Sequence, residues 1–360
     1  MRDGQALITG YPGFIGRRLA ERLIAEGAQV TAVVEPRMAA AARQAAGDAI
    51  EVLEGDIAKR RLGLGDADWE RLTAEVTSVF HLAAIYDLSV PLELAQRVNV
   101  EGTGNVLGFC RACERLERLN YVSTAYVAGL RTGIVYEHEL ALGQGFKNHY
   151  ESTKFQAELW VRQELDRVPI TIYRPAIVVG DSSTGETQKF DGPYFMLRVV
   201  ALCRRRGMPV PQFGRSGAPV NVVPVDFVLD ALIAGSREPA AADETFHLVD
   251  PEPVTAAELM GLLGELYAGH APRYRLPAPI VSSALRVPAV REAFGGAPRE
   301  AIRYLNHPVR FDARRAAAVL GGAGLRVPRF EDYAETLVRF FREHEDDPAY
   351  LPGVNSGRAA

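Results

Sequence analysis

The first half of the chain alternates between short apolar runs and longer segments in which apolar residues recur at helical spacing. The runs, which have the length and composition of buried strands, are Ala6–Thr9, Gln29–Val34, Ile50–Leu53, Ser78–Leu82, Leu119–Val122 and Ile170–Tyr173. The longer segments, which we expect to be helices, include Phe14–Ala25, Leu92–Arg115 and Glu151–Asp166. This alternation predicts an α/β protein with a Rossmann-type, doubly wound parallel sheet.

The second half of the chain does not continue this alternation, and its loop-like and helical segments predict a smaller and mostly helical substrate-binding region. Asp181–Gly192 is polar and has the composition of a loop. Thr255–Tyr267 is a predicted helix with Thr255 as its N-cap and Glu258 at the third position, and Phe330–Glu345 is a closing amphipathic helix. We therefore expect a dinucleotide-binding domain over 1–180 with returning segments near 220–250, a substrate-binding region over 181–345, and a loose tail over 346–360.

Charge and cysteine content narrow the class of protein. A formal net charge of -4 over 360 residues gives no reason to expect nucleic acid or an anionic membrane as a partner. Three cysteines predict no disulfide framework. The first residues enter a strand-like run at once, and no apolar stretch approaches the ~18–20 residues that span a bilayer. These features lead us to expect a cytoplasmic protein without a signal peptide or membrane span.

A glycine-rich turn follows the first predicted strand and opens the first helix. Its sequence runs from Gly10 through Gly13-Phe14-Ile15 to Gly16, a GxxGxxG spacing. Glycine permits a tight turn and lets the backbone approach a dinucleotide pyrophosphate, while free N–H groups at the helix start meet its charge. The same glycines would also fit a plain strand–helix turn. The strand before, the helix after and the acidic residue at the next strand end favour the dinucleotide.

Residues at the ends of the next three strands are placed to bind the rest of the cofactor. Glu35 can accept hydrogen bonds from both adenosine ribose hydroxyls and would repel a 2′-phosphate, which favours NAD over NADP. Arg37 can reach such a phosphate and leaves NADP open; the alternative is that Glu35 and Arg37 are both solvated loop charges. Asp56 and Ile57 suit an adenine contact, with the carboxylate near the exocyclic amine. Small or apolar residues let the backbone approach the cofactor after the fourth strand, namely Leu82, Ala83 and Ala84; we interpret the preceding His81 as a core histidine.

Tyr150 and Lys154 carry the most specific chemical argument. Positions i and i+4 share one face of a helix, and a nearby ammonium stabilises phenolate, which lowers the pKa of a tyrosine. Tyr150 can then exchange a proton with a substrate oxygen during hydride transfer, and Lys154 can also hold the nicotinamide ribose. Ser123 and Thr124 end a buried strand upstream, where a hydroxyl could polarise a carbonyl. A surface pair with no catalytic role is the alternative reading of this spacing.

Three other features have simpler explanations or stay open. Cys110 and Cys113 are interpreted as buried helix cysteines, because no second Cys or His pair has metal-ligand spacing. Arg204–Arg206 is read as a solvated helix end, with a phosphate clamp as the less favoured alternative. Phe190–Val200 can equally line an apolar acyl pocket or belong to a core.

Seven motifs in order resemble the extended short-chain dehydrogenase/reductase superfamily. They include TGYPGFIG, the Gly-Asp56-Ile step, FHLAA, Asn99-Val-Glu-Gly-Thr, YVSTAYVAG, YESTK and the Tyr173-Arg-Pro-Ala-Ile-Val strand. The stretch from Ile177 through Asp181-Ser-Ser-Thr-Gly-Glu to Lys189-Phe-Asp-Gly-Pro-Tyr-Phe195 resembles the fatty acyl-CoA reductase and thioester reductase branch, also called male-sterility-like.

The resemblance implies roles for individual residues. Tyr150 would be the acid/base, and Lys154 would tune it and bind the ribose. Thr124, or Ser123 in second place, would be the substrate hydroxyl partner, and Asn99 would hold a water in a proton relay or brace the site. The backbone of the segment beginning at Pro175 would contact the nicotinamide carboxamide through Ile177 and Val178. Many NADPH-using relatives have arginine where Glu35 stands, which is a departure from the family pattern.

Taken with the residues, the resemblance predicts an NAD(P)H-dependent oxidoreductase that reduces a carbonyl, with NAD(H) favoured by Glu35. The predicted substrate is an acyl thioester, bound to coenzyme A or a carrier, or the derived aldehyde. The alternatives are a ketone or alcohol dehydrogenase for a lipid-like or secondary metabolite, a nucleotide-sugar epimerase or dehydratase, and a non-catalytic dinucleotide sensor. The family also suggests a homodimer formed through helices that flank the sheet.

Overall fold

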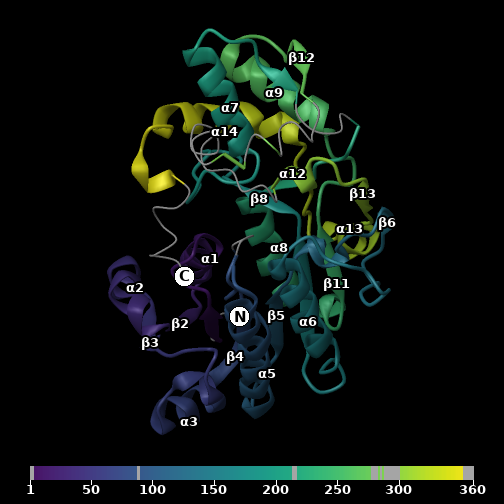
Figure 1. Ribbon diagram of the computed structural model, residues 1–360. Helices are drawn as coiled ribbons and strands as arrows, with labels where there is room; N and C mark the ends of the chain where they lie inside the picture. Colours follow the sequence, from purple (N-terminus) through teal and green to yellow (C-terminus); the bar gives the residue numbers. More distant parts are fainter. Residues whose placement is uncertain are drawn as a thin grey trace.

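The computed structural model describes residues 4–86, 90–212, 217–276, 283, 286–287 and 301–351 (Figure 1). Its centre is a sheet of seven parallel strands, which confirms the predicted α/β class. In order across the sheet the strands are β11 (Thr245–Leu248), β7 (Ile170–Pro175), β5 (Arg118–Val122), β4 (Val76–His81), β1 (Gln5–Thr9), β2 (Gln29–Val34) and β3 (Glu51–Glu54). The order reverses between β1 and β4, where doubly wound sheets bind ligands.

Helices cover both faces of the sheet because its central strands are buried and apolar. One face packs against α1 (Phe14–Ala25), α2 (Ala39–Ala46), α8 (Val225–Arg237) and α13 (Arg314–Gly321). The other packs against α3 (Asp66–Glu75), α5 (Gly102–Ala112) and α6 (His149–Arg162). Burial of apolar surface on both faces is the main term that stabilises this layered arrangement.

A third apolar cluster holds the C-terminal half together, at the top of Figure 1. It is built by α7 (Tyr194–Arg205), α9 (Ala256–Ala268) and α14 (Phe330–His344). Thr255 and Glu258 form the predicted capping box, with Thr255 N donating to Glu258 at 2.7 Å and Glu258 N donating to Thr255 at 3.2 Å. The predicted N-terminus of this helix is therefore confirmed.

The remaining elements are short. Two-stranded parallel pairs join β8 (Ile177–Val179) to β10 (Val222–Pro224), β6 (Gly133–Val135) to β13 (Val309–Phe311), and β9 (Pro211–Gln212) to β12 (Tyr274–Arg275). The short helices include α4 (Leu92–Ala95) and α12 (Ala301–Tyr304). Among the residues that the structure describes, no helix combines the length and the apolar character needed to cross a bilayer.

Two sequence predictions need correction. The helix expected over Leu92–Arg115 is interrupted by a π-helical segment, Gln96–Glu101, and it ends at Ala112. Cys113 therefore lies just beyond the helix and is half-buried, whereas Cys110 is buried within it. The tail expected from 346 is folded as far as 351, because Tyr350 stacks on Phe190 at 5.1 Å; positions 352–360 lie outside the described residues.

Candidate active site

The glycine turn brings backbone segments close together at the start of α1. Gly10 has a φ of +91°, and a Cβ at this position would lie 2.7 Å from the backbone nitrogen of Ala83. A Cβ on Gly13 or Gly16 would lie 2.8 or 2.6 Å from the Gly10 carbonyl oxygen. The helix start has no side-chain cap, which leaves N–H groups of the first turn, at Phe14 and Ile15, available to an anion. This backbone fits a dinucleotide pyrophosphate.

The strand beside β1 closes the other side of this turn. Leu82 N donates to the Thr9 carbonyl at 3.2 Å, and Ala83 N donates to the Thr9 hydroxyl at 3.4 Å, so the chain leaving β4 runs close to Gly10. Ala84 continues this half-buried path. The preceding His81 is buried between the hydroxyls of Thr9 and Thr103, at 2.7 and 3.0 Å, and burial lowers its pKa to about 3. His81 is therefore the core histidine that the sequence predicts.

At the end of β2, two residues of opposite charge pair with each other. Glu35 follows β2 directly, and its carboxylate lies 2.8 Å from Arg37; both side chains are half-exposed. The Asp56 carboxylate accepts a hydrogen bond from Ala58 N at 2.9 Å, which shapes the turn after β3. Ile57 is buried against Gly102 of α5. The ion pair offsets part of the negative charge at the end of β2.

Tyr150 and Lys154 lie one turn apart on α6, as predicted. Lys154 is buried and its ammonium donates to the Val122 carbonyl at 2.8 Å, above the Tyr121 ring at 4.4 Å. Burial lowers the pKa of Lys154 to about 7, although the nearby Glu158 carboxylate raises it. The same buried setting lets Lys154 exchange a proton near neutral pH.

The pKa of the Tyr150 phenol is raised, whereas the sequence predicts that a nearby ammonium lowers it. Burial raises its pKa, a hydrogen bond with Thr124 lowers it, and the Glu151 carboxylate raises it. The Lys154 ammonium is directed at the Val122 carbonyl and does not offset this rise. A raised pKa keeps the phenol protonated, which suits a proton donor.

Thr124 and Ser123 face different partners at the end of β5. Ser123 is buried and donates to Glu158 at 2.6 Å, so its hydroxyl belongs to the interior. Thr124 accepts from Tyr126 N at 3.2 Å and interacts with the phenol of Tyr150. The structure thus brings Thr124, rather than Ser123, together with Tyr150.

Asn99 braces the site from behind. It is buried in the π-helical segment, and its side-chain oxygen accepts from Ile85 N at 2.8 Å. Its amide donates to Thr153 of α6 at 3.0 Å. Asn99 therefore ties the chain leaving β4 to the helix that carries Tyr150, and the extra residue of the π turn aims it there.

The β7–β8 segment is the last part of the candidate site. Pro175 ends β7 and is buried, whereas Ile177 and Val178 are half-buried in β8. Ser123 N donates to the Tyr173 carbonyl at 2.7 Å, so this segment and the end of β5 lie side by side. The end of β7 thus lies beside the end of β5, and Ile177 and Val178 follow it in β8, which pairs with β10.

A buried charged network behind Lys154 was not foreseen from the sequence. Glu158 accepts from Ser123, from Arg174 at 2.6 Å and from Arg162 at 3.1 Å. Glu158 and Arg174 are fully buried. Two signals could have revealed the pair: Glu158 follows Lys154 by four residues, and Arg174 interrupts an otherwise apolar strand.

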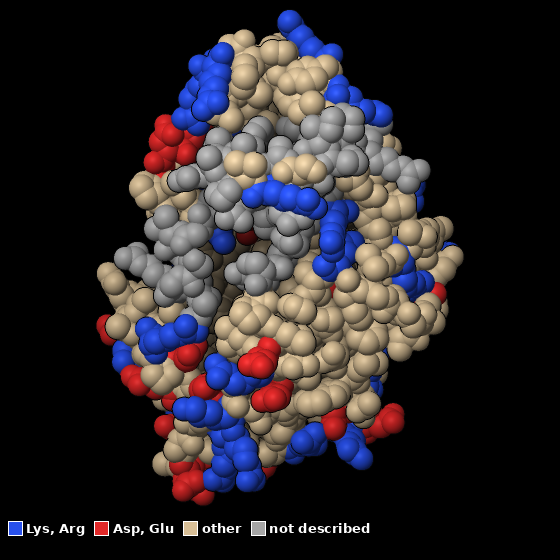
Figure 2. Space-filling model, in the orientation of Figure 1, with Lys and Arg blue, Asp and Glu red and all other residues tan. Residues whose placement is uncertain are grey.

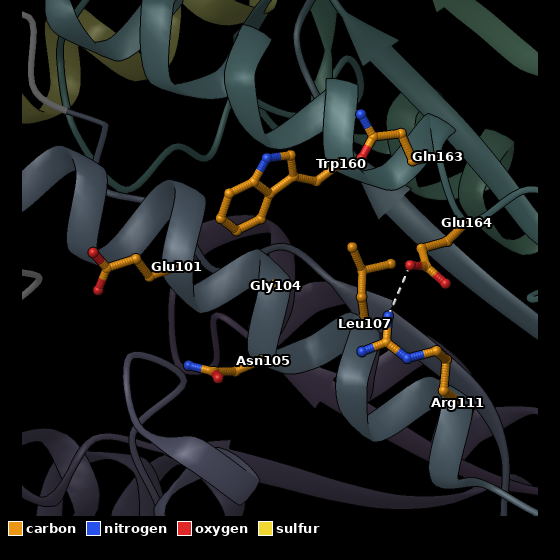
Figure 3. Close-up of a pocket in the computed structure, with 8 residues that line it drawn as sticks. All are labelled: Glu101, Gly104, Asn105, Leu107, Arg111, Trp160, Gln163 and Glu164. Atoms are coloured by element: carbon orange, nitrogen blue, oxygen red, sulfur yellow. Dashed lines mark hydrogen bonds and ion pairs between the residues drawn. The ribbon is translucent and has the colours of Figure 1, made fainter.

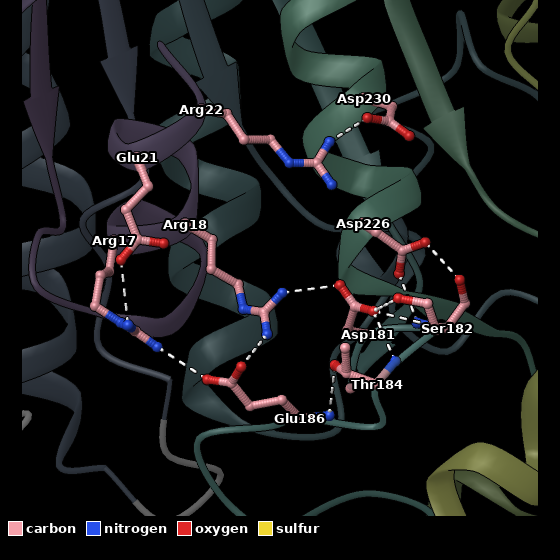
Figure 4. A network of polar contacts seen from close by, with 12 residues as sticks. Arg17, Arg18, Glu21, Arg22, Asp181, Ser182, Thr184, Glu186, Asp226 and Asp230 are labelled. Atoms are coloured by element: carbon pink, nitrogen blue, oxygen red, sulfur yellow. Dashed lines mark hydrogen bonds and ion pairs between the residues drawn. The ribbon is translucent and has the colours of Figure 1, made fainter. Parts of the chain in front are cut away.

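Ion pairs join α1 to the loop that follows β8 (Figure 4). Arg18 contacts Asp181 at 2.9 Å and Glu186 at 2.7 Å. Ser182 donates to Asp226 of α8 at 2.6 Å. Burial would raise the pKa of Asp181, but hydrogen bonds from Ser183, Thr184 and Arg18 lower it to about 2. These contacts hold the loop after β8, through which the chain passes into its C-terminal half, against α1.

Other features singled out from the sequence lie elsewhere. Phe190, Tyr194, Met196 and Leu197 are buried in the C-terminal core, which favours the core interpretation of this stretch. Arg204–Arg206 is exposed at the end of α7, as expected. The face shown in Figure 2 is hollowed below the C-terminal helices, and Lys and Arg side chains stand beside the hollow.

A cavity of about 430 Å³ opens on the outer face of α5 and α6 (Figure 3). Trp160 packs against Gly104 at its wall, and an Arg111–Glu164 ion pair of 2.8 Å borders one end. Trp160 lies about 15 Å along α6 from Tyr150 at the helical rise. None of the predicted site residues lines this cavity, which is separate from the glycine turn.

Comparisons with known proteins agree with this geometry. An NAD-binding family model described as male sterility protein matches residues 8–232. The sequence is 29% identical over 276 residues to a nonribosomal peptide synthetase of a Cladobotryum species, covering 69% of this chain and 26% of that protein. It is 26% identical over 275 residues to the carboxylic acid reductase of Segniliparus rugosus, covering 64% and 23%.

A solved structure shows the same arrangement. The terminal R domain from the myxalamid PKS-NRPS biosynthetic pathway superposes with a TM-score of 0.81 at 26% identity, covering 96% of this chain and 92% of that one. The chain spans about a quarter of the length of the two curated relatives.

Proposed function

Because the chain belongs to the male sterility family of NAD-binding domains, as its motifs indicate, we propose that it is an NAD(P)H-dependent reductase of acyl thioesters or of the derived aldehydes. The observation that carries the proposal is the meeting of Tyr150, Thr124 and Lys154 at the sheet edge that also holds the glycine turn. The two catalogued kinds of relative, a carboxylic acid reductase and peptide synthetases, support a carbonyl substrate.

The chain's own residues supply binding and proton transfer. The bound reduced nicotinamide supplies the hydride. Tyr150 would donate its proton to the carbonyl oxygen while Thr124 hydrogen-bonds that oxygen. Lys154 would hold the ribose hydroxyls and return a proton to Tyr150. A thioester treated in this way gives a hemithioacetal, which releases a thiol and leaves an aldehyde; a second hydride would give an alcohol.

The cofactor pocket would be formed by the glycine turn and the ends of β2, β3, β4 and β8. Gly10, Gly13 and Gly16 would receive the pyrophosphate, with Glu35 on the adenosine ribose and Asp56 near the adenine. We propose a preference for NAD(H), because Glu35 follows β2 directly and its carboxylate would repel a 2′-phosphate. The backbone at Leu82–Ala84 and Pro175–Val178 would border the nicotinamide.

Residues 181–345 would receive the substrate, opposite a dinucleotide-binding part formed by 1–180 and the returning elements β10, α8 and β11. We propose coenzyme A or carrier thioesters as substrates. We also propose that helices flanking the sheet form the interface of a homodimer.

The test is to mix the purified protein with NADH or NADPH and follow cofactor absorbance with acyl-coenzyme A, acyl-carrier thioesters, aldehydes and ketones of graded chain length. Oxidation of the cofactor with thioesters or aldehydes is the expected result; no oxidation with any of them would refute the proposal. Tyr150→Phe should reduce turnover at least ~100-fold with cofactor binding nearly intact. Full activity in that variant would remove Tyr150 from the mechanism.

A further inference from the structure

Tyr150 lies in the first turn of α6, where a helix is least secured by its own hydrogen bonds. Asn148 caps this turn by accepting from Glu151 N at 2.9 Å. One polar cap is a weak constraint on a side chain that must meet a substrate oxygen within hydrogen-bond reach. Further contacts therefore decide where Tyr150 stands.

The carboxylate next to Tyr150 supplies the first of these contacts. Glu151 is fully buried, although it neighbours a residue at the site. Its carboxylate accepts from Lys147 N at 2.9 Å and from the Lys147 ammonium at 3.2 Å. The ammonium also donates to the Gly129 carbonyl at 2.7 Å, just beyond Thr124 and the short helix that follows it. The buried pair thus joins the start of α6 to the chain leaving β5.

Tyr304 of α12 completes the cluster from the C-terminal half. Its hydroxyl donates to Glu151 at 2.7 Å and accepts from Asn148 at 2.9 Å. Its ring meets the edge of Tyr126 at 4.9 Å, and the Lys147 ammonium lies 5.1 Å from the Tyr304 ring. One hydroxyl therefore contacts both the cap and the third residue of the turn that carries Tyr150.

We propose that Tyr304 is a positioning residue for Tyr150, which couples the C-terminal substrate region to the catalytic helix through Glu151. The inference rests on the proposed function. A buried carboxylate that loses a donor must find another partner or shift, since an unsatisfied buried acceptor is costly. The shift would move the first turn of α6, and with it the phenol of Tyr150, relative to Thr124.

The test is Tyr304→Phe, which keeps the ring and removes only the hydroxyl. Kinetics use the substrate identified by the screen described above, with reduced nicotinamide bearing hydrogen or deuterium at the transferred position. We expect kcat to fall roughly tenfold, KM to change less than about threefold, and the deuterium isotope effect on kcat to rise. The matched control is Tyr136→Phe, a half-buried tyrosine whose ring stacks on His138 away from this cluster.

A purely structural role predicts a different result. It would lower the melting temperature and the amount of active protein while leaving the isotope effect unchanged, and that outcome would overturn the proposal. A double-mutant cycle with Glu151→Gln is an independent test. The kcat of the double variant should fall no further than that of the more damaging single variant. Multiplied losses would contradict action through Glu151. If Tyr150→Phe retained activity, the proposed function would fail instead, which separates the two conclusions.

Discussion

Substitution of Glu158 by glutamine tests the network behind Lys154 most sharply. Arg174 is fully buried, and its guanidinium donates to both carboxylate oxygens of Glu158 at distances of 2.6 to 3.1 Å. Removing one charge of a buried pair costs about 3–5 kcal/mol, because the remaining charge is left uncompensated. At the usual unfolding entropy per residue, a chain of 360 residues should then lose about 4–7 °C in melting temperature.

The same substitution should change how activity depends on pH. Glu158 raises the pKa of Lys154, which burial has lowered to about 7. Without the carboxylate the pKa of Lys154 falls further below its ordinary value. The charged ammonium is present below that pKa and is lost as pH rises through it, so the basic limb of kcat/KM should move to lower pH.

The assays are thermal unfolding and the pH profile of kcat/KM for the cofactor, which reports on the free enzyme. Glu75→Gln is the matched control, since Glu75 forms an exposed i,i+4 pair with Arg71 at 3.4 Å. That surface pair should contribute under about 1 kcal/mol to the free energy of unfolding. Its loss in Glu75→Gln should leave the pH profile of kcat/KM unchanged. A basic limb that stays in place or moves to higher pH in Glu158→Gln would refute the electrostatic reasoning.

Three further substitutions test the cofactor site and its brace. Glu35→Arg should shift the ratio of kcat/KM values toward NADPH by at least ~10-fold; an unchanged ratio would mean that Glu35 does not touch the ribose. Gly10→Ala should weaken cofactor binding at least ~10-fold in a fluorescence titration, whereas Gly27→Ala, with a φ of +88° and no neighbour within 4 Å, should only reduce stability. Asn99→Ala should cost about 1–3 kcal/mol of unfolding free energy and lower kcat, and unaltered turnover would show that the brace is dispensable.

Two networks of side-chain contacts hold the residues around Tyr150 in place. Glu158 and Arg174 hold Ser123 from the interior, whereas Glu151 and Tyr304 hold the first turn of α6 from the C-terminal half. Firm support of the residues around Tyr150 favours precise proton transfer.

Several elements were predictable because local physics decides them. Periodicity gave the alternating strands and helices, and the Thr255–Glu258 spacing gave a capping box that the structure contains. Helix geometry alone put Tyr150 and Lys154 on one face. The helix over Leu92–Arg115 was less predictable, because its apolar pattern does not show the extra residue that makes the π turn at Asn99.

The amino-acid sequence by itself determined the βαβ layout, the glycine turn and the spacing of Tyr150 and Lys154, since each depends on neighbours within a few residues. Only the tertiary structure decided that Thr124 faces Tyr150 while Ser123 serves Glu158, and that burial raises the pKa of the Tyr150 phenol more than its hydrogen bond with Thr124 lowers it. It also joined Tyr304 to Glu151 across 153 positions. Such pairings depend on which side chains are brought together and removed from water, and local spacing does not encode that.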